Sequence, residues 1–487
     1  MAWRIEGPGD RSPAQNPGAM NPANTAEIAQ ARVLAVTGPA VGADPMRFLR
    51  RAGSGPRGFW ARPDRWIAHL GALATVVSDG TEPGGLFSGI EANARALFDP
   101  SSVQVLGGAP GLRFFGGFAF RPEYPTADLW SGFPPALFHV PALELAGVAG
   151  EVPLLTVRML VDHEGEGAEA TLTRLLTHAG QICQELEAVG GDVSVDPTGW
   201  SPRAEPAPRV SFTRGETERA GWEAAVKDAL AAISERRVSK VVLARTLDLI
   251  TERRLDPIEV VHHLWQENRG SHVFYFEPEE GCAIAGAAPE TVTTVSEGRF
   301  HATAVAGTVA RGENQREQRQ FAERLLASEK EGAEHRIALE DMVARLGPIA
   351  EDIEAQSEPQ VLTLARLQHL ETKIRARLPE GTSALNVLEA LHPTPAVCGL
   401  PRDAALEFLD EEEPFERGWY AGPVGWFDLD GNGVFVPALR CAVVRDLRWR
   451  LFAGAGIVEG SDPGREWDET SIKFEPMLRA LAASGAR

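Results

Sequence analysis

Three charged side chains near the end of the chain have a spacing that could do chemistry. In the segment SDPGREWDETSIKFEPML, residues 461–478, Glu466, Glu469 and Lys473 follow one another at intervals of three and four residues. If this segment is helical, the three side chains lie on the same face. The sequence therefore predicts a helix that presents two carboxylates and one ammonium group to one neighbourhood.

The residue types also suggest where this helix begins and ends. Asp462 is a favourable N-cap and Pro463 a favourable first helical residue. We expect the helix to run to about Pro476, because a proline ring disturbs the carbonyl group four residues earlier.

An arginine stands in a row of residues that otherwise predicts an apolar face. In VFVPALRCAVV, residues 434–444, Arg440 alternates with Val434, Val436, Ala438 and Ala442. An inward-facing arginine is costly without an anionic partner. That partner could be a carboxylate of the core or a bound ligand, and the pattern leaves both open.

A glutamate occupies a similar position on a predicted helix. In SEKEGAEHRIALEDMV, residues 328–343, Glu334 shares a row with Ala338 and Met342, and Glu331 lies one turn away. A solvated helix edge explains the pattern as well as a functional carboxylate does.

Two further ionisable residues lie next to apolar segments. Lys240 opens a strand whose two faces soon become apolar, and Glu290 ends the small, apolar segment GAAPE, residues 286–290. Lys240 could simply reach water at the end of the strand. Glu290 is either exposed in a turn or buried, and burial would raise its pKa so that it could donate a proton near neutral pH.

Composition excludes several classes of function. The chain has 487 residues, with 48 Lys and Arg against 68 Asp and Glu, a net charge of −20. That balance argues against a surface for nucleic acid or an anionic membrane. No apolar run reaches the roughly 18 residues of a membrane helix. The four cysteines, Cys183, Cys282, Cys398 and Cys441, form no CxxC pair, which favours free thiols in a reducing compartment.

Other motifs are incomplete. GAGIVEG, residues 454–460, has the wrong spacing for a dinucleotide-binding loop. DLDGNG, residues 428–433, begins like a calcium loop, but Leu439 stands where a bidentate glutamate is required, so a hairpin turn is favoured.

The pattern of elements favours an α+β fold without regular βαβ alternation. We expect a glycine-interrupted strand at 113–120 and strands at 239–250, 272–278 and 299–309, and within 419–458. Helices are expected at 167–189, 222–233, 315–346 and 360–378. We divide the chain into a disordered N-terminus, 1–25, an N-terminal half, 26–195, a linker, 196–208, and a catalytic region, 209–487.

Taken together, short segments of the chain resemble those of chorismate-utilising enzymes, and of isochorismate synthases of the menaquinone-pathway type in particular. The segments are KVVLAR (240–245), GAAPE (286–290), AVAGT (304–308), SEKEGAEH (328–335), QHLET (368–372), HPTPAVCG (392–399), RGWYAGPVGW (417–426), ALRC (438–441), AGAGIV (453–458) and EWDETSIK (466–473). The resemblance covers about 210–480 and extends weakly to 113–120 and 130–145. It implies an αββα fold of large antiparallel sheets flanked by helices, with Mg²⁺ and chorismate bound between them.

The resemblance also implies a role for individual residues. Glu334 and Glu469 resemble the family's magnesium ligands, with Glu331 and Glu466 near the ion or its waters, and a few carboxylates plus water suit Mg²⁺. The residues that resemble the family's substrate site are Gly307, Thr308, His392, Ala396, Tyr420, Arg440, Gly454 and Lys473. For His392 a structural role stays equally open. His369 matches a family histidine for which we expect only a packing role.

Lys240 resembles the family's general base and Glu290 its general acid. In isochorismate formation water attacks C2 of the ring while the 4-hydroxyl leaves, so one end of the reaction needs a proton acceptor and the other a proton donor.

Several positions favour water as the nucleophile within this resemblance. Ammonia-using relatives typically carry Gln at the position of Lys240, and some carry a nucleophilic lysine where this chain has Ala306. Salicylate synthases share the lysine but tend to have Thr in place of Ala396, and Phe452 is also typical of isochorismate synthases. The sequence departs from the commoner GASPE at Ala288, which removes a hydroxyl near Glu290.

The resemblance leaves two alternatives, a salicylate synthase and a catalytically silent chorismate-fold binding subunit. It implies Mg²⁺ as cofactor, chorismate as small-molecule substrate, and a cytoplasmic monomer without a glutamine amidotransferase subunit. The product could feed menaquinone, a siderophore or another pathway.

Overall fold

The computed structural model describes most of the chain. The described residues are 32–51, 55–82, 84–98, 103–106, 111–124, 128–161, 168–187, 210–212, 218–312, 314–363 and 367–485. The predicted N-terminal segment 1–25 and linker 196–208 lie outside them. Within this part of the chain, no helix combines the length and the apolar character that crossing a bilayer requires.

The sheet divides into two branches at one long strand, β6 (Ala136–Val148). From β6 the first branch runs through β3 (Arg65–Ser78), β2 (Arg57–Ala61), β10 (His272–Glu279), β11 (Cys282–Ala288), β20 (Cys441–Arg445), β21 (Arg448–Ile457) and β9 (Lys240–Thr251). The short strands β8 (Val210–Phe212) and β17 (Gly399–Leu400) pair with β9 at its outer edge.

The second branch leaves the other edge of β6. It runs through β5 (Arg113–Phe118), β18 (Pro423–Asp428), β19 (Gly433–Pro437), β12 (Thr293–Ser296), β13 (Arg299–Ala310) and β16 (Leu367–Arg377). β14 (Glu351–Ala355) and β15 (Gln360–Thr363) pair with the far side of β16. Beyond β6 the sheet continues through β7 (Leu154–Val161) to β1 (Arg32–Pro39) and β4 (Val103–Leu106). Among the strands that the structure describes, every pairing is antiparallel except that of β1 with β4.

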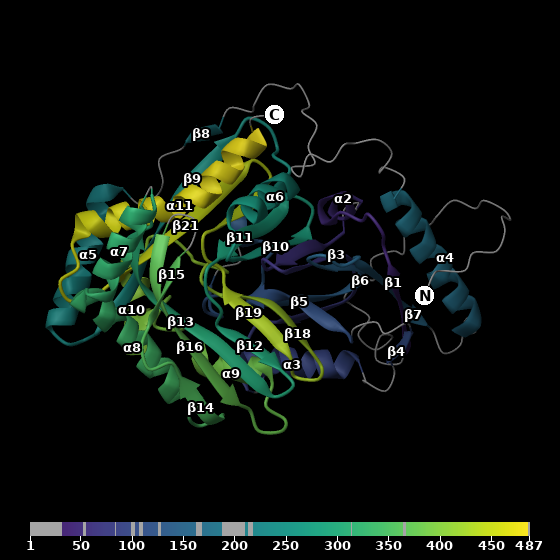
Figure 1. Ribbon diagram of the computed structural model, residues 1–487, viewed down its shortest axis with the longest axis horizontal. Helices are drawn as coiled ribbons and strands as arrows, with labels where there is room; N and C mark the ends of the chain where they lie inside the picture. Colours follow the sequence, from purple (N-terminus) through teal and green to yellow (C-terminus); the bar gives the residue numbers. More distant parts are fainter. Residues whose placement is uncertain are drawn as a thin grey trace.

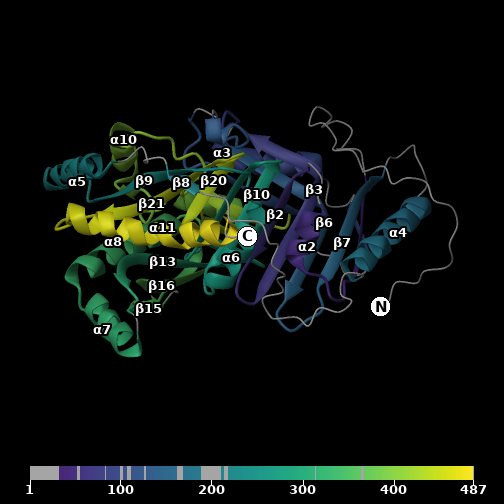
Figure 2. The ribbon, with the colours of Figure 1, turned by 90° about the horizontal axis from the view of Figure 1, so that it is seen from above.

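Helices pack against both branches, mainly on their outer faces. They are α2 (Pro45–Arg50), α3 (Gly85–Leu97), α4 (Ala168–Glu187), α5 (Arg219–Ser234), α6 (Pro257–Glu267), α7 (Gln315–Leu326), α8 (Glu329–Leu346), α9 (Ala384–Leu391), α10 (Arg402–Glu412) and α11 (Pro463–Gly485), with the 3₁₀ turn η2 (Asp128–Trp130). In Figure 1, α6 and α11 lie on one side of the strands, and α3, α8 and α9 lie on the other. Figure 2 shows α4, β7 and β6 at the opposite end of the molecule from α5 and α7.

Three apolar cores correspond to this layering. One lies between the branches, where Ile284 and Val443 of the first share a cluster with Val424 and Val436 of the second. A second packs α2, α4, α6 and α11 on the outside of the first branch, and a third packs α3, α8 and α9 on the second. The layers are therefore helix, sheet, sheet and helix, and the predicted α+β class is confirmed.

Two predicted elements are wrong. The stretch 360–378 forms strands β15 and β16, because β16 pairs along its whole length with β13 and alternates buried Thr372, Ile374 and Ala376 with exposed neighbours. The C-terminal helix does not end at Pro476 but continues to Gly485. Beyond the proline, Met477 and Leu481 are buried in the core beneath α11, and that burial outweighs the lost backbone hydrogen bond.

Other local predictions are confirmed. α4 occupies the predicted 167–189 helix, and Asp428 of the 428–433 segment accepts hydrogen bonds from Asp430 N and Asn432 N in a hairpin turn between β18 and β19. The Gly116–Gly117 pair marks a close backbone approach, since a side chain on Gly116 would overlap with the Leu137 carbonyl group. All four cysteines are free and buried.

Candidate active site

A cavity of about 690 Å³, counting the open space at its mouth, lies where the two branches, α8 and α11 meet. Its lining includes all but three of the residues predicted for the site. Those that line it are Lys240, Glu290, Gly307, Thr308, Glu334, Ala396, Tyr420, Arg440, Gly454, Glu469 and Lys473. Glu331, Glu466 and His392 are not among the lining residues. Residues that are more than 200 positions apart in sequence therefore share one concave site.

Lys240 begins β9 and is paired there with Leu400 of β17, and the pairing of β9 with β21 begins one residue later, at Val241. Lys240 is 1% exposed, so its side chain is buried and does not extend from the end of the strand into water. Its Nζ atom lies 2.9 Å from Oε1 of Glu334 on α8. Gly456 leaves room for this pair, because a side chain there would overlap with both partners.

Glu290 lies two residues after the end of β11 and is buried. Burial raises the pKa of its carboxyl to about 7, although the positive charges of Lys240, Arg440 and Lys473 oppose the rise. Near neutral pH such a group exists in both forms, which suits a proton donor. Glu290 and Lys240 line the same cavity.

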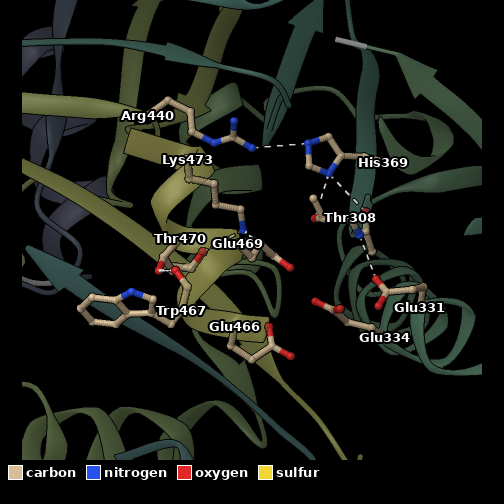
Figure 3. Close-up of polar contacts among 12 residues, drawn as sticks. Thr308, Glu331, Glu334, His369, Arg440, Glu466, Trp467, Glu469, Thr470 and Lys473 are labelled. Carbon is tan, nitrogen blue, oxygen red and sulfur yellow. Dashed lines mark hydrogen bonds and ion pairs between the residues drawn. The ribbon is translucent and has the colours of Figure 1, made fainter. Parts of the chain in front are cut away.

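Four carboxylates from two helices approach one another beside the cavity. Figure 3 shows Glu331 and Glu334 on one helix, and Glu466 and Glu469 on the other, with their carboxyl ends turned toward the space between the helices. Ammonium groups neutralise this cluster only in part. Lys473 Nζ lies 2.6 Å from Glu469 Oε1, and Lys330 Nζ lies 2.9 Å from Glu466 Oε1.

The electrostatics of these carboxylates reflect their crowding. Burial and the neighbouring Glu334 charge raise the pKa of Glu331, and burial and the neighbouring Glu469 charge raise that of Glu466. For Glu334 burial acts in the same direction, but the adjacent Lys240 ammonium outweighs it and lowers the pKa.

These carboxylates fit a hard divalent cation by chemistry. Mg²⁺ prefers oxygen ligands such as carboxylates. The negative charges of these carboxylates repel one another, and a bound cation would relieve that repulsion. Within the described part of the chain, no three His, Cys, Asp or Glu side chains yet converge at metal-binding distance.

Thr308 depends on Gly307 for its position. Gly307 has a positive φ of 75° at an irregularity in the pairing of β13 with β16, where a larger residue would be strained and would crowd Glu331. The Thr308 N–H donates to Glu331 Oε2 at 2.8 Å. Glu331 therefore holds the irregular part of β13 that forms one wall of the cavity.

The prediction that Arg440 lies within a strand is wrong. It lies between β19 and β20, with a positive φ of 49°, so the alternating row is broken before it. It forms no ion pair with a core carboxylate among the described residues, and its Nη2 atom lies 3.4 Å from Nε2 of His369. Its guanidinium group lines the cavity and is available for an anionic ligand.

His369 is a cavity residue for which the sequence suggested only packing. Burial, together with the charges of Arg440 and Lys473, lowers its pKa well below the usual range. The neutral ring can donate from Nδ1 to the Gly307 carbonyl oxygen at 3.2 Å, which leaves Nε2 to accept from Arg440. The family motif QHLET contains this histidine, but the motif alone did not indicate that it contacts Arg440.

His392 was predicted in the substrate site, and the structure places it elsewhere. Its Nε2 atom lies 2.9 Å from the Phe120 carbonyl oxygen, and its ring packs edge-on against Phe87 and Phe120. These contacts favour a structural role for His392 over a contact with substrate.

The ion pair of Arg417 with Glu413, which the sequence did not reveal, supports the back of the cavity. The buried Arg417 donates to the carbonyl oxygens of Val242 and Val397, at 2.7 and 2.8 Å, and pairs with Glu413. Glu413 in turn accepts from the Ala244 N–H at 2.8 Å. These side chains satisfy the edge of β9 beyond the point where β17 ends, and so hold the strand that carries Lys240.

An aromatic pair forms the apolar wall. The rings of Tyr420 and Phe452 stack with their centroids 4.8 Å apart, and Leu439 lines the same cavity. The cavity thus joins a cationic end, a carboxylate cluster and an apolar surface, which suits a ring that carries carboxylates.

Comparisons with known proteins agree with this geometry. A family model described as chorismate binding enzyme matches residues 19–482. The chain is 34% identical over 427 residues to the salicylate biosynthesis isochorismate synthase of Pseudomonas aeruginosa, covering 88% of this chain and 85% of the relative. It is 32% identical over 447 residues to isochorismate synthase MenF of Bacillus subtilis, covering 90% and 91%.

A solved structure has the same architecture. It is MenF, the menaquinone-specific isochorismate synthase from Escherichia coli, which superposes with a TM-score of 0.72 at 28% identity and covers 93% of this chain and 94% of its own.

Proposed function

This chain belongs to the chorismate-binding enzymes, and from that membership we propose that it is an isochorismate synthase that converts chorismate to isochorismate. The observation that carries the proposal is that Lys240 and Glu290 face one cavity together with Arg440 and Lys473. Such a cavity offers a proton acceptor, a proton donor and two anion-binding groups to one small substrate.

Arg440 and Lys473 bind and orient the substrate. The two side chains line the cavity from the loop before β20 and from α11, and chorismate carries two carboxylates. Arg440 can give a bidentate contact, with His369 fixing its direction, whereas Lys473 offers a compact charge. Orientation alone lowers the barrier, because it brings ring and water together in one geometry.

The acid and the base complete the reaction. In the form that reacts, Lys240 is the free amine rather than the ammonium ion that pairs with Glu334 in the structure, and it accepts a proton from the water molecule whose oxygen bonds to C2 of the ring. The protonated carboxyl of Glu290 gives its proton to the 4-hydroxyl, which leaves as water while the double bonds shift. One water enters and one leaves, so the product is an isomer of the substrate.

We assign Mg²⁺ binding to Glu334 and Glu469, with Glu331 and Glu466 beside them. The crowding of their charges supports this assignment. When bound, the ion would supply positive charge to the ring carboxylate and stabilise the electron-rich transition state.

Salicylate synthase, which would go on to eliminate pyruvate, is the second candidate. The P. aeruginosa relative is named for salicylate biosynthesis and also as an isochorismate synthase, whereas the E. coli neighbour is menaquinone-specific, so the names support the first step in both settings. Ala396, which lines the cavity, favours isochorismate as the end product. We expect no amidotransferase subunit, because Lys240 stands where ammonia-using enzymes carry glutamine, and we expect a monomer.

Product analysis tests the proposal. Purified protein with chorismate and Mg²⁺ should yield isochorismate, identified by chromatography, with no pyruvate detected by coupled lactate dehydrogenase. Release of one pyruvate per chorismate would identify a salicylate synthase. No consumption of chorismate would favour a silent binding subunit.

A further inference from the structure

Lys330 bridges the two helices that carry the carboxylates. From α8 its Nζ atom reaches Glu466 Oε1 of α11 at 2.9 Å, and it lies 3.6 Å from Glu331 Oε1 of its own helix. It is not one of the residues that line the cavity. It therefore contributes charge to the carboxylate cluster without facing the substrate.

The three ammonium groups of the cluster differ in their freedom to move. The side chain of Lys240 is 1% exposed and that of Lys473 is 15% exposed, whereas that of Lys330 is 32% exposed. Lys473 is also fixed by a hydrogen bond to the Gly454 carbonyl oxygen at 2.8 Å. Among the three, Lys330 has the most exposed side chain, and a long, flexible lysine side chain can extend its ammonium group into water.

Its position also conflicts with metal binding. The Glu466 Oε1 atom that Lys330 contacts is a donor that a divalent cation would need, or would reach through a water molecule. The side chain of Glu466 is only 3% exposed, so few other groups can neutralise it. Without a cation, loss of Lys330 would leave that carboxylate buried and unpaired.

We propose that Lys330 is a built-in counter-cation that competes with the divalent metal for Glu466 and Glu331 and so sets the metal affinity of the site. The inference rests on the proposed metal site. Lys330 ties α8 to α11 while the metal is absent, and its ammonium group moves out to solvent when the metal enters. It is a positioning residue that tunes the site and makes no contact with substrate.

Titration of the substrate-free protein with Mg²⁺ alone tests this idea, with isothermal calorimetry as the readout. Lys330→Met should bind Mg²⁺ roughly tenfold more tightly than the wild type, because a competing positive charge is removed. The same variant should melt at a lower temperature without Mg²⁺ and gain more from its addition. Lys330→Arg, which keeps the charge, should bind Mg²⁺ as weakly as the wild type, and Lys227→Met on the exposed face of α5 is the matched control.

The sign of the effect separates the outcomes. Local damage would weaken Mg²⁺ binding, so equal or weaker binding by Lys330→Met overturns the inference while the proposed function stands. If Lys330→Met does not fold, the same comparison is made with Lys330→Gln. If the wild type binds no Mg²⁺ but still forms isochorismate, both the metal assignment and this inference fail, and the catalytic assignment survives.

Discussion

The amine of Lys240 lies 2.9 Å from the carboxylate of Glu334, and both side chains are largely withdrawn from solvent. The proposed general base and a proposed metal ligand are therefore direct partners. The pair joins the start of β9 to α8, and so links the first branch to a helix that packs on the second. A change at either residue should consequently affect both proton transfer and metal binding.

Replacement of Lys240 tests the base. Lys240→Ala should lower kcat by about 10²–10⁴-fold, the usual contribution of a positioned proton acceptor, while the fold survives. Turnover is followed as isochorismate formation and the fold by circular dichroism, with Lys227→Ala as the control. Near-normal kcat in Lys240→Ala would remove the residue from the mechanism.

Replacement of Glu290 tests the acid. Glu290→Gln should abolish turnover, because an amide cannot deliver the proton to the leaving hydroxyl. In the wild type, kcat/KM should fall as the pH rises through about 7, since only the protonated carboxyl is competent. A profile that stays level from pH 6 to 9 would contradict this assignment.

The same carboxyl should make the stability of the protein depend on pH. Its folded pKa of about 7 exceeds the unfolded value, so the stabilisation is complete below about pH 4.5 and is lost as the pH rises through 7. Between these limits the free energy of unfolding should fall by up to about 3 kcal/mol from this group. Urea titrations at pH 5 and pH 8 should show that loss in the wild type relative to Glu290→Gln, and equal differences at both pH values would argue against a buried, perturbed carboxyl.

The support behind β9 should appear as a large effect on stability. Glu413→Gln leaves the guanidinium group of Arg417 buried without its partner, which typically costs about 3 kcal/mol or more. Glu411→Gln, on the exposed end of α10, should change the free energy of unfolding by less than about 0.5 kcal/mol. Equal urea midpoints for the two variants would mean that the pair is dispensable.

A carboxylate on α11 should couple metal and substrate. Glu469→Ala should weaken both the Mg²⁺ dependence of turnover and the apparent affinity for chorismate, because it also removes the partner of Lys473. Asp468→Ala, one residue away and exposed, is the matched control. An unchanged Mg²⁺ titration in Glu469→Ala would remove it from the ligand set.

Much of the site could be predicted because local sequence patterns indicated which side chains lie close together. Glu334 in a row with Ala338, and Glu466 and Glu469 on one helix face, follow directly from helical periodicity. Lys240 and Glu290 were singled out as ionisable groups next to apolar segments, but only the resemblance to a family gave them roles. The structure adds that they share a cavity.

The parts that failed depended on partners distant in sequence. The alternation of Thr372, Ile374 and Ala376 is compatible with a strand, but the polar residues of this segment also suit a helix. The pairing of β16 with β13 decides in favour of the strand. Arg440 looked like part of a strand because nothing local showed its positive φ. His369 and Arg417 gained their roles from contacts across 71 and 175 residues, which no local pattern contains.

The division of the sheet into two branches at β6 has a consequence for any attempt to shorten the protein. Residues 57–61 cover one edge of β10, and residues 113–117 cover one edge of β18. A fragment that began after the predicted linker would expose both edges, each with a row of unpaired backbone groups ready to pair with another chain. Such a fragment should form aggregates rather than a smaller catalyst, although every proposed catalytic side chain would still be encoded in it.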